Sequence, residues 1–225
     1  MTYHFESYAD REMMFIDLAN HLAGELRQAL DHKDRVLFVV PGGTTPGPIF
    51  DDLCDVDLDW ARVDVMLSDE RWVPEDSDRS NTRLIRERLL TGKAQAAAFH
   101  PLYARAETPE AVLPELEAGI MPCLPIDVLL LGMGADMHTA SIFPEADNLI
   151  EALSPTAPIL VPMRAPGAPE PRVTLSARVL DGAVSKHIVI TGDETRDALD
   201  MARHLKHGDA PISAVWNGAT VHWAA

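Results

Sequence analysis

The 225-residue sequence has few cysteines and few basic residues. Its two cysteines, Cys54 and Cys123, are far apart and match no metal-binding or redox spacing, so we expect two reduced thiols. Lysine and arginine together number 19, against 35 aspartates and glutamates, which gives a net charge of −16. This charge repels the phosphates of nucleic acids and argues against a nucleic-acid partner.

Long apolar runs are also absent, and none of the apolar stretches could span a bilayer. The N-terminus shows no basic start followed by an apolar block, so no secretory signal is predicted. We therefore expect a cytoplasmic protein with no membrane association. With 47% hydrophobic residues and no internal repeat, residues 1–225 are expected to form a single domain.

Short apolar runs rich in β-branched residues recur along the chain and predict strands. Their near-continuous hydrophobicity is typical of strands buried on both faces of a parallel sheet. The runs are VLFVV (36–40), VDVMLS (63–68), DVLLLGM (127–133), ILVPM (159–163), HIVITG (187–192) and SAVW (213–216). Helical patterns lie between them at 10–30, 81–90 and 193–205. The alternation predicts a doubly wound α/β fold, with a mainly parallel sheet flanked by helices.

Ligands of such folds bind beyond the carboxyl ends of the strands, where four segments are chemically rich. The first is VVPGGTTPGPIF (39–50), in which a glycine- and threonine-rich loop precedes a proline-marked helix start. The loop consists of Gly42, Gly43, Thr44 and Thr45. Its glycines allow close backbone approach, and N–H groups at a helix start attract phosphate. An ordinary strand-to-helix turn has the same composition, and the ending of a Walker loop is missing.

The second segment, at 66–85, places Asp69, Glu70 and Arg71 directly after a strand. The planar guanidinium of Arg71 suits a phosphate or a carboxylate. Ser80 or Asn81 is expected to cap the following helix. The alternative for the three charged residues is a solvated surface cluster.

The third segment is LGMGADMHTASIFP (131–144). Gly132 and Gly134 allow a tight turn, and the following HTAS is compatible with a helix start. Asp136 and His138 lie near the same strand end. A lone histidine is more often structural than catalytic, so the alternative is that Asp136 caps a helix while His138 packs in the turn.

The fourth segment is VITGDETRDAL (189–199), where Asp193 or Thr195 is expected to cap a helix. Arg196 lies in its first turn, where the helix dipole disfavours a cation, so an anionic partner is predicted. The alternative is a surface ion pair. Taken together, the four strand ends predict a site that binds a small phosphorylated molecule and contains an acid–base group of the protein.

These motifs resemble those of the 6-phosphogluconolactonase family over most of the chain. The family's Gly-Gly-Ser/Thr-Thr/Ser-Pro loop is matched from Gly42, its Asp-Glu-Arg-x-Val-Pro segment from Asp69, and its Leu-Gly-x-Gly-x-Asp-Gly-His-Thr-Ala-Ser motif from Leu131. A Pro-x-Arg-x-Thr-Leu pattern is also matched in part, around Arg172. The order and spacing of four motifs are more specific than any one of them. The resemblance implies the fold of glucosamine-6-phosphate deaminase and ribose-5-phosphate isomerase.

Two residues depart from the family pattern. Met137 stands where the family usually has glycine, and at a positive φ it would cost about 1 kcal/mol. Arg196 stands where relatives often carry lysine, which keeps the charge but changes its shape.

The resemblance implies hydrolysis of a small phosphorylated sugar lactone, 6-phosphogluconolactone, in the pentose phosphate pathway. His138 would act as general base, and Asp136 would orient it or bind a hydroxyl. The substrate-binding residues would be Gly42, Gly43, Thr44, Thr45, Asp69, Arg71, Gly134, Arg172 and Arg196. Backbone N–H groups around Gly42, Gly43 or Gly134 would stabilise the oxyanion. We expect no metal, no cofactor, and a monomer or small homo-oligomer. The alternatives are a sugar-phosphate isomerase or deaminase on the same fold, and a non-catalytic sugar-phosphate sensor.

Overall fold

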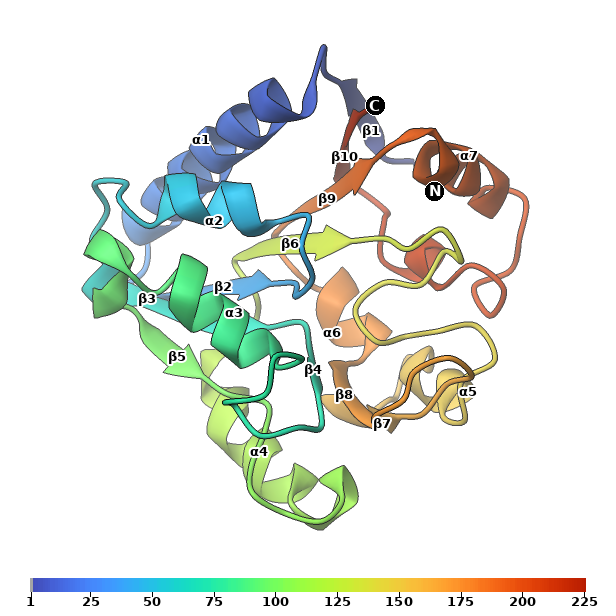
Figure 1. Cartoon of the computed structure of the whole chain (residues 1–225). Coiled ribbons are helices and arrows are strands. Elements are labelled where there is room, and N and C mark those ends of the chain that lie inside the picture. The colour runs from blue at the N-terminus through green and yellow to red at the C-terminus, as the bar shows by residue number, and fades with distance from the viewer. Residues whose placement is uncertain (1) are drawn as a thin grey trace.

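A computed structural model describes residues 2–225, which form two β-sheets surrounded by helices (Figure 1). The larger sheet has the strand order β1-β10-β9-β6-β2-β3-β5, and all its neighbouring strands are parallel. Its strands are β1 (His4–Ser7), β2 (Val36–Val40), β3 (Val63–Leu67), β5 (Ala98–His100), β6 (Val128–Gly132), β9 (Ser185–Thr191) and β10 (Thr220–Ala224). From the central pair β2 and β6, the chain winds outward in both directions. The predicted doubly wound parallel fold is therefore confirmed.

A smaller antiparallel sheet adjoins the larger one, in the order β4-β8-β7. It consists of β4 (Asp69–Arg71), β7 (Leu160–Met163) and β8 (Arg172–Leu175). The two sheets meet at Ser68, whose N–H donates to the carbonyl of Val40 and whose carbonyl accepts from the N–H of Leu175. The apolar run of β3 thus leaves one sheet and enters the other within a single residue, which brings β4 to the carboxyl end of the larger sheet.

Seven α-helices and five short 3-10 helices connect the strands of residues 2–225. The α-helices are α1 (Arg11–Leu30), α2 (Gly47–Leu53), α3 (Asn81–Arg88), α4 (Leu113–Ile120), α5 (Leu149–Ala152), α6 (Ala177–Asp181) and α7 (Asp193–Ala202). The 3-10 helices are η1 (Trp60–Arg62), η2 (Gly92–Ala96), η3 (Pro109–Ala111), η4 (Met121–Cys123) and η5 (Pro211–Ala214). Among residues 2–225, no helix has the length and apolar content needed to cross a membrane.

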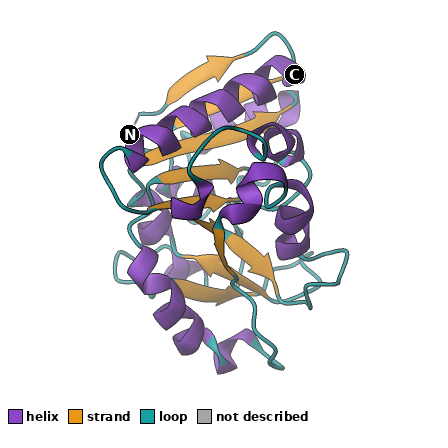
Figure 2. Ribbon diagram, turned by 90° about the vertical axis from the view of Figure 1, so that its left-hand side faces the viewer, coloured by secondary structure: helices purple, strands orange, loops and turns teal. Residues whose placement is uncertain are grey.

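The long helix α1 confirms the predicted helix at 10–30. It begins where the side chain of Asp10 accepts a hydrogen bond of 2.8 Å from the N–H of Met13. Its apolar stripe packs against α2 and against β2, β6 and β10. Figure 2 shows α1 lying across the strands of the larger sheet. The predicted helices at 81–90 and 193–205 also form, as the shorter α3 and α7.

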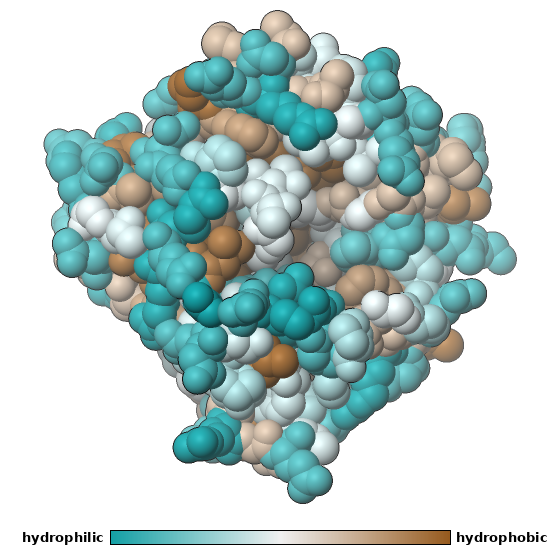
Figure 3. Space-filling model, viewed as in Figure 1, coloured by the Kyte–Doolittle hydropathy of each residue, from teal (hydrophilic) through white to brown (hydrophobic). Residues whose placement is uncertain are grey.

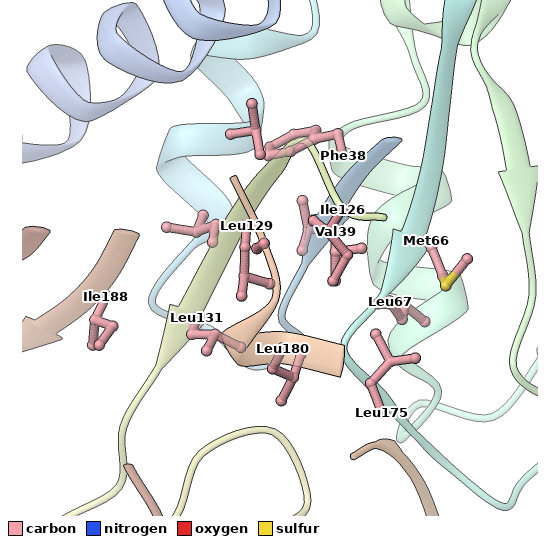
Figure 4. Close-up of a cluster of buried hydrophobic side chains, with 14 of the residues drawn as sticks. Phe38, Val39, Met66, Leu67, Ile126, Leu129, Leu131, Leu175, Leu180 and Ile188 are labelled. Carbon is pink, nitrogen blue, oxygen red and sulfur yellow. The ribbon is translucent and has the colours of Figure 1, made fainter. Parts of the chain in front are cut away.

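The core lies between the larger sheet and the helices, and it extends under the smaller sheet. Figure 4 shows Phe38, Leu129 and Leu131 of neighbouring strands with Leu180 of α6 and Leu175 of β8 in one buried cluster. All five side chains are at most 1% exposed. Burial on this scale contributes about 2 kcal/mol per large side chain, so the strand ends project from a well-packed base.

Two predictions about secondary structure are wrong. SAVW (213–216) is not a strand but overlaps η5, where the N–H of Ser213 donates to the carbonyl of Ala210 at 2.9 Å. The run is apolar because it is buried, and periodicity cannot identify so short a segment. HTAS does not start a helix either, since Met137 and Ala140 adopt positive φ values of 66° and 49°. A left-handed residue cannot continue a right-handed helix.

The carboxylate of Glu70 is completely buried and joins β4 to the start of α3. It accepts hydrogen bonds from the N–H groups of Arg71 at 2.7 Å, Asn81 at 2.8 Å and Thr82 at 2.7 Å, and from the Thr82 hydroxyl at 2.8 Å. Burial raises the pKa of Glu70, and these hydrogen bonds offset part of the rise. An anion at a helix N-terminus also interacts favourably with the helix dipole. Because Glu70 and Asp69 are both buried, the alternative of a solvated charge cluster is excluded for them.

A second buried polar network lies between α1 and the strands β1, β10 and β9. His187 bonds Glu25 through Nε2 and His222 through Nδ1, each at 2.9 Å. Nδ1 of His222 lies 2.9 Å from the Tyr8 hydroxyl. Burial lowers the pKa of His222 to about 3, and the positive charge of neighbouring His187 acts in the same direction.

This network predicts acid sensitivity. In the unfolded chain a histidine has a pKa of about 6.5, so between roughly pH 6.5 and 3 the unfolded state binds a proton at His222 that the folded state does not. The free energy of unfolding therefore falls as the pH is lowered through this range. His222→Gln should reduce the slope by up to about 1.4 kcal/mol per pH unit in urea denaturation. The matched control is His4→Gln, at an exposed histidine. Equal slopes in the wild type and His222→Gln would contradict the assignment.

Glu70→Gln should lower the free energy of unfolding by roughly 2–4 kcal/mol, measured by urea denaturation at neutral pH. All the hydrogen-bond partners of Glu70 are donors, so the NH₂ group of glutamine would face another N–H. Glu87→Gln, which removes an exposed helical ion pair with Arg83, is the control and should cost about 0.5 kcal/mol or less. If both variants were equally stable, Glu70 would not have the stabilising role described above.

Candidate active site

A pocket of about 280 Å³ opens where the strand order reverses between β2 and β6. Ligands of open α/β sheets bind at such a switch point. The pocket lies among the loops that follow β2 and β6 and the ends of β4 and β8. Figure 3 shows small residues of intermediate hydropathy in the middle of this face, with a hollow and strongly hydrophilic side chains beside them. Its volume is suited to a small ligand.

The loop after β2 forms one wall of the pocket and contains the predicted residues Gly42, Gly43, Thr44 and Thr45. Among residues 2–225, the N–H groups of these four have no hydrogen-bond acceptor, so they are free to bind a ligand. A Cβ atom at Gly42 would lie 2.1 Å from the side chain of Asn81, which explains the glycine. As predicted, a helix follows, with Pro46 at the N-cap of α2.

The opposite wall carries two arginines on adjacent strands. Arg71 of β4 is paired directly with Arg172 of β8 in the antiparallel ladder, so both side chains lie on the same face of the smaller sheet. Both line the pocket, and the Nε of each is buried without an acceptor. Like charges directly opposite each other are destabilising, and buried donors without partners are costly. An anion bound between them would relieve both effects.

The carboxylate of Asp69 lies beside this arginine pair and lines the same pocket. It accepts hydrogen bonds from the hydroxyls of Ser68 at 3.0 Å and Ser141 at 2.6 Å. Burial lowers the pKa of Arg172; the Asp69 carboxylate opposes this effect, and the charge of Arg71 adds to it. Asp69 therefore offsets part of the positive charge and, through Ser141, connects the smaller sheet to the loop after β6.

His138 and Asp136 lie together on the loop after β6, and His138 lines the pocket. Nδ1 of His138 is 2.5 Å from a carboxylate oxygen of Asp136, and the His138 N–H donates to the same oxygen at 3.2 Å. Burial acts to raise the pKa of Asp136, but the hydrogen bond and the charge of His138 outweigh it, and the pKa is lowered. Because Nδ1 of His138 faces the Asp136 carboxylate, a proton on Nδ1 leaves Nε2 as the acceptor in the neutral imidazole.

Gly134 has a different role from the predicted oxyanion contact. Its N–H donates to the carbonyl of His138 at 3.1 Å and so is not free for a ligand. A Cβ atom at this position would lie 2.4 Å from the imidazole of His138 and 2.6 Å from the carboxylate of Asp136. Glycine is therefore required here to make room for the His138–Asp136 pair.

Met137 adopts the left-handed conformation that its position in the motif suggested, with φ at 66°. Its side chain is only 8% exposed and belongs to the core, and its carbonyl accepts from the N–H of Ile212 at 3.1 Å. Left-handed backbone costs a non-glycine residue about 1–2 kcal/mol. Burial of a methionine side chain contributes about 2 kcal/mol in the opposite direction, so this loop keeps its turn without the glycine.

Arg196, which was predicted to bind substrate, lies outside the pocket lining, as does Asp136, which was predicted to orient His138 or bind a hydroxyl. Arg196 is exposed, and its guanidinium carbon lies 4.6 Å from the centre of the Trp223 ring. The helix α7 begins after Gly192 with no side-chain cap, contrary to the expectation for Asp193 or Thr195. A cation–π contact therefore accounts for an arginine in this first turn.

Several lining residues were not predicted to contact a ligand, and Asn81 and Thr195 are polar ones among them. Asn81, expected only as a helix cap, is buried and directs its amide to the carbonyl of Asp69 at 3.0 Å, while Ser80 is the actual cap. Thr195 lines the pocket in place of Arg196. Both residues could have been predicted from the sequence, because each is polar and lies in the first turn of a helix that follows a strand.

Comparison with known proteins identifies the relatives of this chain. The family described as glucosamine-6-phosphate isomerases/6-phosphogluconolactonase matches residues 9–223. A 6-phosphogluconolactonase from Mesorhizobium japonicum is 40% identical, with 99% of this chain and 96% of that protein aligned. One from Pseudomonas aeruginosa is also 40% identical, over 92% of this chain and 88% of that protein.

Solved structures agree with the sequence comparison. The crystal structure of a 6-phosphogluconolactonase from Shewanella baltica has a TM-score of 0.96 at 33% identity, covering 100% of this chain and 98% of that one. A monomeric glucosamine-6-phosphate deaminase has a TM-score of 0.83 at 15% identity, with coverage of 98% and 97%, and shares the fold. The chain therefore belongs to the family of glucosamine-6-phosphate isomerases and 6-phosphogluconolactonases.

Proposed function

We propose that this protein hydrolyses 6-phosphogluconolactone to 6-phosphogluconate, the second step of the oxidative pentose phosphate pathway. The observation that carries the proposal is one pocket in which a histidine held by a carboxylate faces two arginines and a loop with free N–H groups. Relatives about 40% identical over nearly the whole chain are 6-phosphogluconolactonases, which supports the same substrate here.

The 6-phosphate would be held between the arginine pair and the glycine–threonine loop. Arg71 and Arg172 supply buried guanidinium donors that have no acceptor within the described chain. The N–H groups of the loop Gly42–Thr45 and its two threonine hydroxyls add uncharged donors on the facing wall. Charge-assisted hydrogen bonds of this kind are stronger than neutral ones, and they select an anion on a protein whose net charge is −16.

His138 would act as the general base at the other end of the substrate. Nε2 takes a proton from a water molecule, whose oxygen attacks the lactone carbonyl carbon. Asp136 accepts a hydrogen bond from the Nδ1–H group throughout and stabilises the imidazolium that forms. When the tetrahedral intermediate collapses, the bond from carbon to the ring oxygen breaks, and His138 returns its proton to that oxygen. The product is the open-chain acid, which ionises to the carboxylate.

The developing oxyanion needs donors other than the N–H of Gly134, which is already bonded to His138. The loop Gly42–Thr45 offers free N–H groups, and Asn81 places an amide at the same wall. Two such donors would supply the usual electrostatic contribution to ester hydrolysis. Asp69, near the arginines, would bind a sugar hydroxyl as an acceptor.

Substitution of His138 tests the proposal directly. His138→Ala should lower kcat for freshly prepared 6-phosphogluconolactone by about 100-fold or more, after subtraction of spontaneous hydrolysis, in an assay coupled to 6-phosphogluconate oxidation. His204→Ala, at an exposed histidine outside the pocket, is the matched control and should leave kcat unchanged. A near-wild-type kcat in a folded His138→Ala variant would exclude the general-base role. Ammonia release from glucosamine 6-phosphate would indicate a deaminase, and binding without turnover a sensor.

Phosphate binding is tested by a pair of arginine substitutions. Arg71→Ala should raise KM roughly 10- to 100-fold, because it removes a buried charged donor from the substrate's anionic group. Arg196→Ala should leave KM within about twofold of the wild type, since its side chain stacks on Trp223 outside the pocket lining. A raised KM in Arg196→Ala together with an unchanged KM in Arg71→Ala would show that the phosphate binds at α7 and not at the arginine pair.

A further inference from the structure

Asp64, His100 and Cys123 form a compact cluster at the edge of the larger sheet, away from the pocket. They come from β3, β5 and η4, and one potential ligand atom of each lies within 4.8 Å of the other two. Nε2 of His100 lies 2.8 Å from Oδ1 of Asp64 and 3.6 Å from Sγ of Cys123. The same imidazole nitrogen thus faces both a carboxylate and a thiol.

We propose that these three side chains form a binding site for a zinc-class divalent cation. Thiolate sulfur, imidazole nitrogen and carboxylate oxygen are the ligand types that zinc takes in proteins. Tetrahedral coordination with ordinary zinc bond lengths places nitrogen and sulfur about 3.6 Å apart, and nitrogen and oxygen about 3.4 Å apart. The first separation is already present, and the second requires a shift of roughly half an ångström.

The surroundings of the cluster support the site. Arg35 donates to both oxygens of Asp64, at 2.8 and 2.9 Å, and fixes the carboxylate as an outer-shell partner does in metal sites. Each carboxylate oxygen has two lone pairs, so this ion pair leaves room for a metal bond. Asp64 is buried, whereas His100 and Cys123 are partly exposed, which gives the ion a path from solvent. Water would take the fourth position.

Proton release should accompany binding. Zinc binds cysteine as the thiolate, so binding at Cys123 releases the thiol proton to solvent. The thiolate then supplies one negative charge to the ion, beside the Asp64 carboxylate that Arg35 also binds. Cysteine spacing in the sequence does not reveal the site, because each ligand lies on a different element.

The site is separate from the proposed catalysis. None of its three residues lines the active-site pocket. Asp64 lies near the start of β3, five residues before Asp69, which corresponds to roughly 16 Å of extended chain. A bound ion would hold β3, β5 and η4 together and so stabilise this sheet edge rather than take part in turnover.

Zinc titration of the full chain tests the proposal, by calorimetry after treatment with a chelator. One Zn²⁺ should bind per chain with release of a proton, and bound zinc should raise Tm. Co²⁺ in place of zinc should give a thiolate-to-cobalt charge-transfer band. Cys123→Ser should weaken zinc binding about tenfold or more and abolish the band, and His100→Ala should weaken binding similarly.

Two matched variants make the result specific. Cys54→Ser removes the other cysteine, and His21→Ala disrupts the Glu6, Asp17 and His21 group, whose carboxylates already accept from Tyr8. Both should bind zinc as the wild type does. The assignment would be overturned if the wild type bound no stoichiometric zinc. It would also be overturned if Cys123→Ser kept the wild-type zinc affinity or the cobalt charge-transfer band. Both outcomes are independent of the lactonase assay.

Discussion

The buried carboxylate of Glu70 is the contact on which the geometry of the pocket depends. Glu70 lies between Asp69 and Arg71 in the sequence. Its carboxylate accepts hydrogen bonds from three backbone N–H groups, one in β4 and two at the start of α3. By tying that helix to the strand, it fixes Asn81 behind the loop after β2 and directs its two charged neighbours into the pocket. Glu70 does not line the pocket, but it sets the positions of Asp69, Arg71 and Asn81, which do.

The second constraint is electrostatic, because a protein of net charge −16 attracts no anion at long range. The proposed specificity is therefore local. Arg71 and Arg172 lie directly opposite each other across an antiparallel pair, and the Nε of each is buried without an acceptor, so together they form a site that favours an anion. Asp69 moderates this charge and, through Ser141, links the arginine wall to the loop of His138. Anion binding and proton transfer are thus connected through one carboxylate.

Much of this could be predicted from sequence where one physical signal dominates. Strands buried on both faces, such as VLFVV (36–40), have an unambiguous apolar pattern, and the loops at their ends follow from the topology. Short or partly polar strands gave no such signal: β10 contains His222, whose burial depends on a hydrogen-bond network that spans distant segments. The partner of Arg196 could not be predicted, because a cation in the first turn of a helix indicates an anion nearby, whereas its guanidinium stacks on the ring of Trp223, which lies on a distant strand. The burial of Glu70 could not be predicted either, since its partners at the start of α3, Asn81 and Thr82, follow it by 11 and 12 residues.

We propose that one pocket binds phosphate at the arginine pair and presents the opposite end of the substrate to His138. The decisive measurement is a crystal structure with the product, 6-phosphogluconate. We expect the phosphate oxygens within hydrogen-bonding distance of Arg71, Arg172 and the N–H groups of the loop Gly42–Thr45, with the C1 carboxylate beside Nε2 of His138. A product bound in the reverse orientation, or with its phosphate at Arg196, would contradict it.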